Sequence, residues 1–83
     1  MTPSLGQLLR QARMHRAADA PIYLDIAHGA YLARISPTRV LDFEYGFQRP
    51  TEAELMALCV ALCIVGRPFA ALMDAYGRQE DAA

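Results

Sequence analysis

Apolar residues recur at intervals of three and four positions along most of the chain, which is the spacing that places them on one face of an α-helix. The first such stripe starts directly after Ser4, a residue type that caps helix N-termini, and runs from Leu5 to Ala12. The sequence contains neither a sustained two-residue alternation nor the Asn-Gly or Asp-Gly pairs that form tight hairpins. The pattern therefore predicts an all-α fold of five short helices.

The second helix has two alternative starts. Residues 17–21 interrupt the apolar stripe of the first helix. Pro21 opens a longer helix in one interpretation, because proline is tolerated in the first turn. In the other interpretation residues 21–24 form a connector, and Asp25 caps a helix over residues 26–33. The sequence leaves both alternatives open.

The third helix has clearer limits. Ser36 is a good N-cap and Pro37 fits the first helical position. The helix is predicted to run to about Tyr45 and to stop at Gly46, because glycine readily adopts the left-handed conformation that ends helices.

Two further helices follow. Thr51 and Glu54 form a capping box that predicts a fourth helix over about residues 52–65, apolar on both faces and stopped by Gly66. Pro68 is predicted to open a fifth helix that ends at Gly77. The predicted organisation is an N-terminal arm (1–4), one domain (5–77) and a flexible tail (78–83).

Composition supports one small domain with spare apolar surface. The 83 residues are 54% hydrophobic, which is above the usual share and favours a partner such as a second copy of the chain. Residues 1–51 hold six arginines and four acids, whereas residues 52–83 hold two arginines and five acids, for a net charge of −1 overall. A polyanionic partner is therefore expected to meet the first part of the chain.

The two cysteines do not predict a disulfide or a metal centre. Cys59 and Cys63 lie four apart on the predicted fourth helix, where their Cβ atoms are ~5–6 Å apart, whereas a disulfide needs ~3.5–4.5 Å. Both are expected in the core. His15 and His28 are not spaced to complete a metal site with them, so neither a metal nor a cofactor is expected. Low cysteine content and the lack of a signal sequence or a membrane-length apolar run predict a cytoplasmic protein.

The stretch 35–51, ISPTRVLDFEYGFQRPT, resembles the centre of the Cro/CI-type (Xre-like) helix-turn-helix family. The matching positions are Ile35, Ser36, Val40, Phe43, Glu44, Gly46, Pro50 and Thr51. The first and fourth helices also match, so the resemblance covers about residues 5–73. Arg34 departs from the pattern, because it stands where a turn glycine is usual, and so does Ile26, which stands where many members have glutamine. The resemblance implies a five-helix, lambda-repressor-like bundle with a central helix-turn-helix.

The resemblance also implies a function. It predicts a transcriptional regulator, a repressor in the first instance, that binds double-stranded DNA as a homodimer in the nucleoid. Arg39 is the main candidate for reading a base, because an arginine near the start of a groove-bound helix can grip guanine. The residues predicted to contact DNA are Ser36, Thr38, Arg39, Asp42, Tyr45, Arg34, Arg49 and His28.

Other residues have predicted structural roles. The resemblance implies that Arg13 pairs with Glu44 and braces the motif. Phe69, Leu72, Met73 and Tyr76 follow helical spacing and either close the core or form a two-fold dimer interface. No nucleophile motif, glycine-rich phosphate loop or acid–base pair points to an enzyme.

A protein-binding function is the alternative. In this interpretation the helix-turn-helix is a degenerate scaffold in an antitoxin, an anti-repressor or a regulatory subunit. The net charge of −1, Asp42 and Ile26 favour it. A basic face around the third helix would support DNA binding, whereas an apolar face that includes Leu41 and Tyr45 would support a protein partner.

Overall fold

All regular secondary structure in the described part of the chain is helical, as the apolar pattern predicts. The computed structural model describes residues 3–82, with side chains as far as residue 78. Within these residues there are five α-helices, one short 3₁₀ helix and no strand. The elements are α1 (Leu5–Asp19), η1 (Pro21–Leu24), α2 (Ile26–Ala33), α3 (Pro37–Tyr45), α4 (Glu52–Ala61) and α5 (Gly66–Ala82).

Side-chain caps define most helix starts. Ser4 and Gln7 form a capping box at α1, and Thr51 and Glu54 form another at α4, each with the side chain of one residue bonded to the backbone of the other. The Ser36 hydroxyl accepts a hydrogen bond from the Arg39 backbone N–H at the start of α3. These short-range bonds explain why the predicted starts of the three helices agree with the structure.

The start of the second helix is also decided by a cap. The Asp25 carboxylate accepts a hydrogen bond of 2.9 Å from the backbone N–H of Ala27, so α2 begins at Ile26. Residues 21–24 form the separate 3₁₀ turn η1. Of the two alternatives, the connector followed by a helix over residues 26–33 is therefore correct, and the longer helix from Pro21 is wrong.

Three predicted helix ends are wrong. Helix α4 stops at Ala61, and Cys63 adopts a left-handed conformation with φ 54° before α5 starts at Gly66. Helix α5 begins two residues ahead of Pro68, which sits in its first turn, where no backbone donor is needed. It also continues through Gly77 to Ala82, because one interior glycine weakens a helix by only about 1 kcal/mol. The predicted tail is thus helical as far as Ala82, while residues 1–2 and 83 lie outside the described residues.

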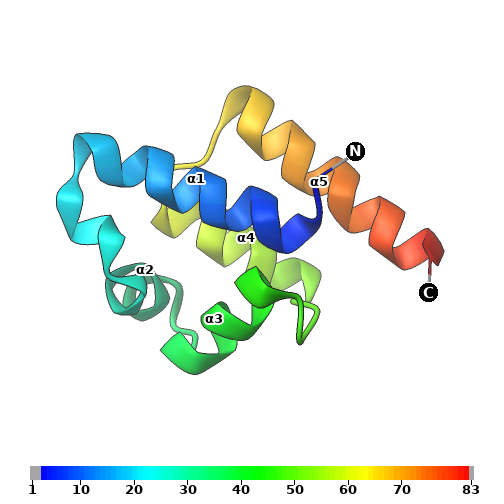
Figure 1. The fold of residues 1–83 in the computed structure, drawn as a ribbon, viewed down its shortest axis with the longest axis horizontal. Helices are drawn as coiled ribbons and strands as arrows, with labels where there is room; N and C mark the ends of the chain where they lie inside the picture. Colours follow the sequence, from blue (N-terminus) through cyan, green and yellow to red (C-terminus); the bar gives the residue numbers. More distant parts are fainter. Residues whose placement is uncertain (1–2, 83) are drawn as a thin grey trace.

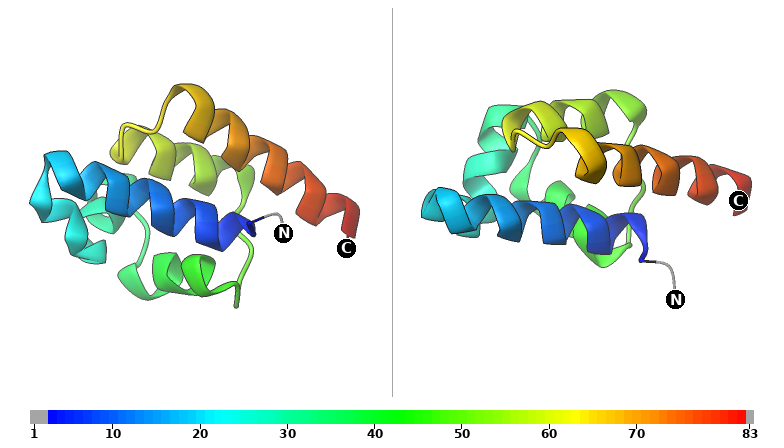
Figure 2. Two further views of the ribbon diagram at one scale, coloured as in Figure 1. Left: turned by 45° about the horizontal axis from the view of Figure 1, so that its top comes forward. Right: turned by 90° about the horizontal axis from the view of Figure 1, so that it is seen from above.

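The helices pack around a single core. Helix α1 contacts α3 on one side and α5 on the other, and α2 contacts α3 and α4 (Figure 1). The two further views in Figure 2 agree that α5 runs alongside α1. The largest fully buried side chains are Phe43, Leu5, Leu55, Leu58 and Leu72. None of the described helices has the length and apolar character needed to cross a membrane.

The start of α1 lies unusually close to the end of α3. A Cβ atom added to Gly6 would stand 2.5 Å from the backbone carbonyl oxygens of both Phe43 and Glu44. Contacts this short do not occur for real side chains, so only glycine fits between the two backbones. The close approach holds the inner face of α3 against the first turn of α1.

Candidate nucleic-acid interface

Helices α2 and α3 form a helix-turn-helix in which residues 34–36 make the turn. Arg34 closes α2 in the left-handed conformation, with φ 60° and ψ 41°. The Ile35 backbone N–H then donates a 2.9 Å hydrogen bond to the Ala30 carbonyl, and Ser36 caps α3. Ala30 is completely buried, as suits the small residue at the place where the two helices meet. The geometry is that of a tight, backbone-bonded turn between two short helices.

An arginine–glutamate pair braces this unit from behind. Arg13 of α1 donates from Nε to Glu44 Oε2 at 2.8 Å and from Nη2 to Glu44 Oε1 at 3.1 Å. Its Nη1 donates to the carbonyls of Tyr23 and Leu24. The hydrogen bond to Glu44 raises the pKa of the Arg13 guanidinium above its usual value. One largely buried side chain therefore ties α1, η1 and α3 together, in the pairing that the resemblance implies.

The outer face of α3 is exposed and largely apolar. Thr38 is exposed, Leu41 retains 40% of its accessible surface and Tyr45 retains 65%. Phe47, just beyond the helix, is 77% exposed, and its ring stacks on Tyr45 with centroids 6.1 Å apart. Tyr31 of α2 is 79% exposed. Tyr31 and Tyr45 lie on the two helices of the helix-turn-helix and Phe47 lies just beyond them, and none of the three rings belongs to the core cluster.

The Arg39 side chain is directed toward α4, where it forms hydrogen bonds within the protein. Its Nε and Nη2 donate to the two carboxylate oxygens of Glu54 at 2.6 and 2.9 Å, and its Nη1 donates to the Gln48 side chain. The guanidinium also lies 5.0 Å from the centroid of the Phe43 ring. The Arg39 hydrogen bond holds the pKa of Glu54 at about 2, well below its usual value of 4.5. The residue predicted to read guanine is thus engaged within the protein.

Asp42 is engaged in the same way. Its Oδ2 accepts a 3.0 Å hydrogen bond from the amide of Gln48, the residue that also receives a hydrogen bond from Arg39. The two charged residues that α3 was predicted to offer to DNA therefore belong to one network that includes Glu54 of the next helix. Both Arg39 and Asp42 therefore have hydrogen-bond partners within the protein.

The turn itself brings predicted residues together. Arg34, Ser36 and Arg39 line a shallow hollow of about 320 Å³ between the turn and α4. A second hollow of about 510 Å³ on the α2 side of the turn is lined by Tyr31, Arg34 and Pro37, among others. Arg34 borders both hollows and is exposed. It is the cation placed at the centre of this surface.

His28 and Arg49 have other neighbours. The His28 ring meets the Tyr23 ring edge-on, with centroids 5.1 Å apart. The Arg49 guanidinium lies 4.0 Å from the Tyr76 ring centroid, and its Nη2 donates to the Tyr76 carbonyl. Arg49 therefore joins the segment after α3 to α5.

The predicted dimer-interface residues pack against the core. Leu72 is 1% exposed, and the other three members of the set, Phe69, Met73 and Tyr76, are partly buried against the core cluster. This agrees with the first of their two predicted roles. The expectation that both cysteines are buried is half wrong: Cys59 is in the core, where burial raises the pKa of its thiol, but Cys63 is exposed because α4 ends before it.

Two residues of the candidate interface, Glu54 and Tyr31, are not predicted from the sequence. The sequence indicates only a capping box for Glu54, and nothing in helical spacing connects it to Arg39, fifteen residues earlier. Gly29, Ala30 and Ala33 mark the buried face of α2, and Tyr31 falls on another side of this helix. These three small residues on one face of α2 are the sequence signal that could have predicted an exposed Tyr31.

Comparison with protein-family models, with curated proteins and with solved structures returned no match.

Proposed function

We propose that this chain is a helix-turn-helix regulator of transcription, acting as a repressor, that places α3 in the major groove of DNA in the nucleoid. The observation that carries the proposal is the exposed α2–turn–α3 unit, with Arg34 at its turn and the capped start of α3 next to it. The N-terminus of a helix attracts anions, and an adjacent arginine adds a full positive charge. Together they suit a DNA phosphate.

The conformation of Arg34 supports a functional role. A non-glycine residue in the left-handed region destabilises the fold by about 1 kcal/mol relative to glycine. Arg34 is exposed, so burial of its side chain does not offset this cost. Strain of this kind often marks residues kept for binding. A phosphate contact supplies a reason for an arginine at this position.

Reading of bases is assigned to the outer face of α3. Thr38 can contact a phosphate or a thymine methyl group, and Leu41 and Tyr45 present apolar surface that thymine methyl groups match. Arg39 acts as a positioning residue in this account, because Glu54 and Gln48 hold its guanidinium. Reading guanine would require Arg39 to leave Glu54.

Pairing of two copies completes the proposal. A homodimer would place two α3 helices on successive faces of the major groove, ~34 Å apart. With a net charge of −1, few phosphates are neutralised by each copy, so affinity is expected to be modest and to fall with salt.

A protein partner is the second candidate function. The observation that favours it is the exposure of Tyr31, Tyr45 and Phe47 beside a helix whose own charges are internally paired. Aromatic residues are enriched and charges depleted at the centres of protein interfaces. The domain would then use the same face for a partner that has a complementary apolar surface.

An anisotropy titration separates the two functions. Labelled duplex from upstream of the gene is compared with a scrambled duplex of equal composition at about 50 and about 200 mM salt. Preference for the native duplex that weakens with salt supports DNA binding. Equal binding of both duplexes, or none, rejects sequence-specific DNA binding by this face and leaves the protein partner.

A further inference from the structure

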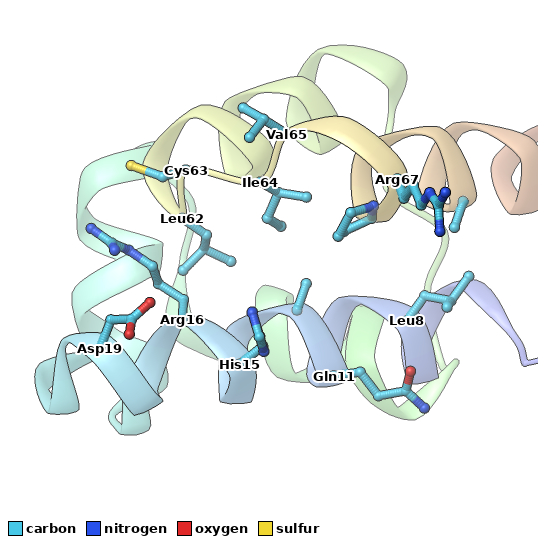
Figure 3. A pocket seen from close by; sticks show the side chains of 13 residues that line it. Leu8, Gln11, His15, Arg16, Asp19, Leu62, Cys63, Ile64, Val65 and Arg67 are labelled. Carbon is cyan, nitrogen blue, oxygen red and sulfur yellow. The ribbon is translucent and has the colours of Figure 1, made fainter.

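A further hollow of the molecule lies away from the helix-turn-helix. It occupies about 650 Å³ between α1 and the segment that links α4 to α5, within the range of volumes typical of small-molecule sites (Figure 3). Ile64 and Leu62 point into it from the linking segment, and Leu8 and His15 border it from α1. None of the residues proposed to contact DNA lines this hollow, so the proposed DNA contacts do not use it.

The lining combines an apolar middle with a positive edge. Leucine, isoleucine, valine, alanine and proline side chains supply most of the wall. The charged residues in the lining are Arg16, Arg67 and one acid, Asp19. Figure 3 shows Arg16 and Asp19 at one end of the hollow and Arg67 toward the other. An excess of positive charge next to apolar walls favours an anion with an apolar body.

Arg16 is the residue best suited to hold the anionic group. Its Nε is buried and has no hydrogen-bond partner among the described residues. Buried donors of this kind are rare and are usually satisfied by a ligand or by water. The guanidinium lies over the Tyr23 ring at 5.2 Å, and in Figure 3 it is directed away from the middle of the hollow. A carboxylate that met the Nε–Nη edge would satisfy the donor through two parallel hydrogen bonds, once the guanidinium turned toward the hollow.

We propose that the hollow between α1 and the α4–α5 link binds a small organic carboxylate with an apolar chain or ring, with its carboxylate on Arg16. The apolar part lies against Leu62 and Ile64. The proposal concerns a second site, so it holds whether α3 binds DNA or a protein.

The first experiment needs no variant. The full chain, labelled with ¹⁵N, is titrated with sodium decanoate, and separately with 1-decanol and with decyltrimethylammonium, which have the same chain and a neutral or positive head. Decanoate is expected to bind saturably, at least tenfold more tightly than either control, and to shift the backbone signals of His15, Arg16 and Ile64. Equal affinity for the three probes, or shifts centred on residues 38–45, would overturn the proposal.

A matched pair of variants tests the role of Arg16. Arg16→Gln is expected to weaken decanoate binding tenfold or more, because it removes the charge-assisted hydrogen bonds. Arg10→Gln, which removes an exposed arginine of α1 that does not line the hollow, is expected to leave the affinity within twofold. Unchanged binding by Arg16→Gln, or an equal loss in both variants, would contradict the assignment. If Arg16→Gln does not fold, the comparison of decanoate with decanol in the unaltered chain decides the question.

Discussion

The two faces of α3 differ in how far the rest of the fold buries their side chains. On the inner face, Val40 and Phe43 are 4% and 2% exposed, and Glu44 is held by Arg13. On the outer face, Leu41 and Tyr45, each next to one of these residues in the sequence, are 40% and 65% exposed. Packing explains the residues of the inner face fully. Leu41 and Tyr45 on the outer face do not belong to the core cluster, so the residues of this face are the better candidates for a function.

The largest expected effect comes from breaking the buried pair on the inner face. Glu44→Gln leaves the Arg13 charge largely buried without its ionic partner, which should destabilise the fold by about 3 kcal/mol. Urea unfolding followed by circular dichroism measures this loss. Glu52→Gln, at an exposed acid in the first turn of α4, is the control and should change stability by less than about 0.5 kcal/mol. Equal losses in the two variants would show that Glu44 is not a brace.

A somewhat smaller effect is expected where α1 touches α3. Gly6→Ala places a methyl group against two backbone carbonyls, and the overpacking should destabilise by about 2 kcal/mol even though alanine favours a helix by about 1 kcal/mol. Gly77→Ala in α5 has open space around the added methyl and should stabilise by about 0.5–1 kcal/mol. Thermal melting of both variants gives the comparison. A Gly6→Ala protein as stable as Gly77→Ala would refute the close approach.

On the outer side, one substitution of Arg34 should raise the stability of the fold and weaken DNA binding. Arg34→Gly relieves the left-handed strain and should stabilise by about 1 kcal/mol, while the loss of a phosphate contact weakens DNA binding and lowers the salt slope by about one unit. Urea unfolding and anisotropy titrations measure the two effects. Arg34→Lys keeps both the charge and the strain, so its stability and salt slope should stay near those of the original chain. Unaltered DNA binding by Arg34→Gly would remove Arg34 from the interface.

The smallest effect is expected at the edge between the two faces, where Arg39 meets Glu54. The folded pKa of Glu54 is about 2 and its usual value is 4.5. A lowered acid pKa stabilises the fold fully above 4.5, and that contribution is lost as the pH falls from 4.5 toward 2. Glu54→Gln should therefore reduce the fall in melting temperature between about pH 5 and about pH 3. An identical pH profile in Glu54→Gln would show that the pair adds no stability.

Local signals allowed much of this fold to be predicted from the sequence. The caps at Ser36 and Thr51 join a side chain to a backbone group three residues away, so the sequence contains both partners. The sequence does not predict the end of α5 correctly because glycine is only a weak stop, and Gly77 lies inside that helix. It does not predict the end of α4 correctly because the chain turns at Cys63, a residue type that gives no signal for a left-handed conformation. Packing between distant helices overrides such signals.

The candidate site was predicted less completely, for a related reason. Arg39 has the sequence position of a base reader, but its environment depends on Glu54, which reaches it only after the chain has turned into α4. The pairing of Arg13 with Glu44, thirty-one residues apart, was expected only because of the family resemblance. Contacts between residues this far apart follow from the fold and not from helical spacing.

The most direct test of the account is an enrichment of duplexes from a randomised pool by the original chain and by the double variant Thr38→Ala, Tyr45→Ala. Both substitutions lie on the exposed face of α3, so the double variant should keep its fold. The account predicts that the original chain enriches one sequence, repeated with two-fold symmetry at about one helical turn, and that the double variant does not. Failure of the original chain to enrich any sequence would contradict DNA reading by α3 and leave this face to a protein partner.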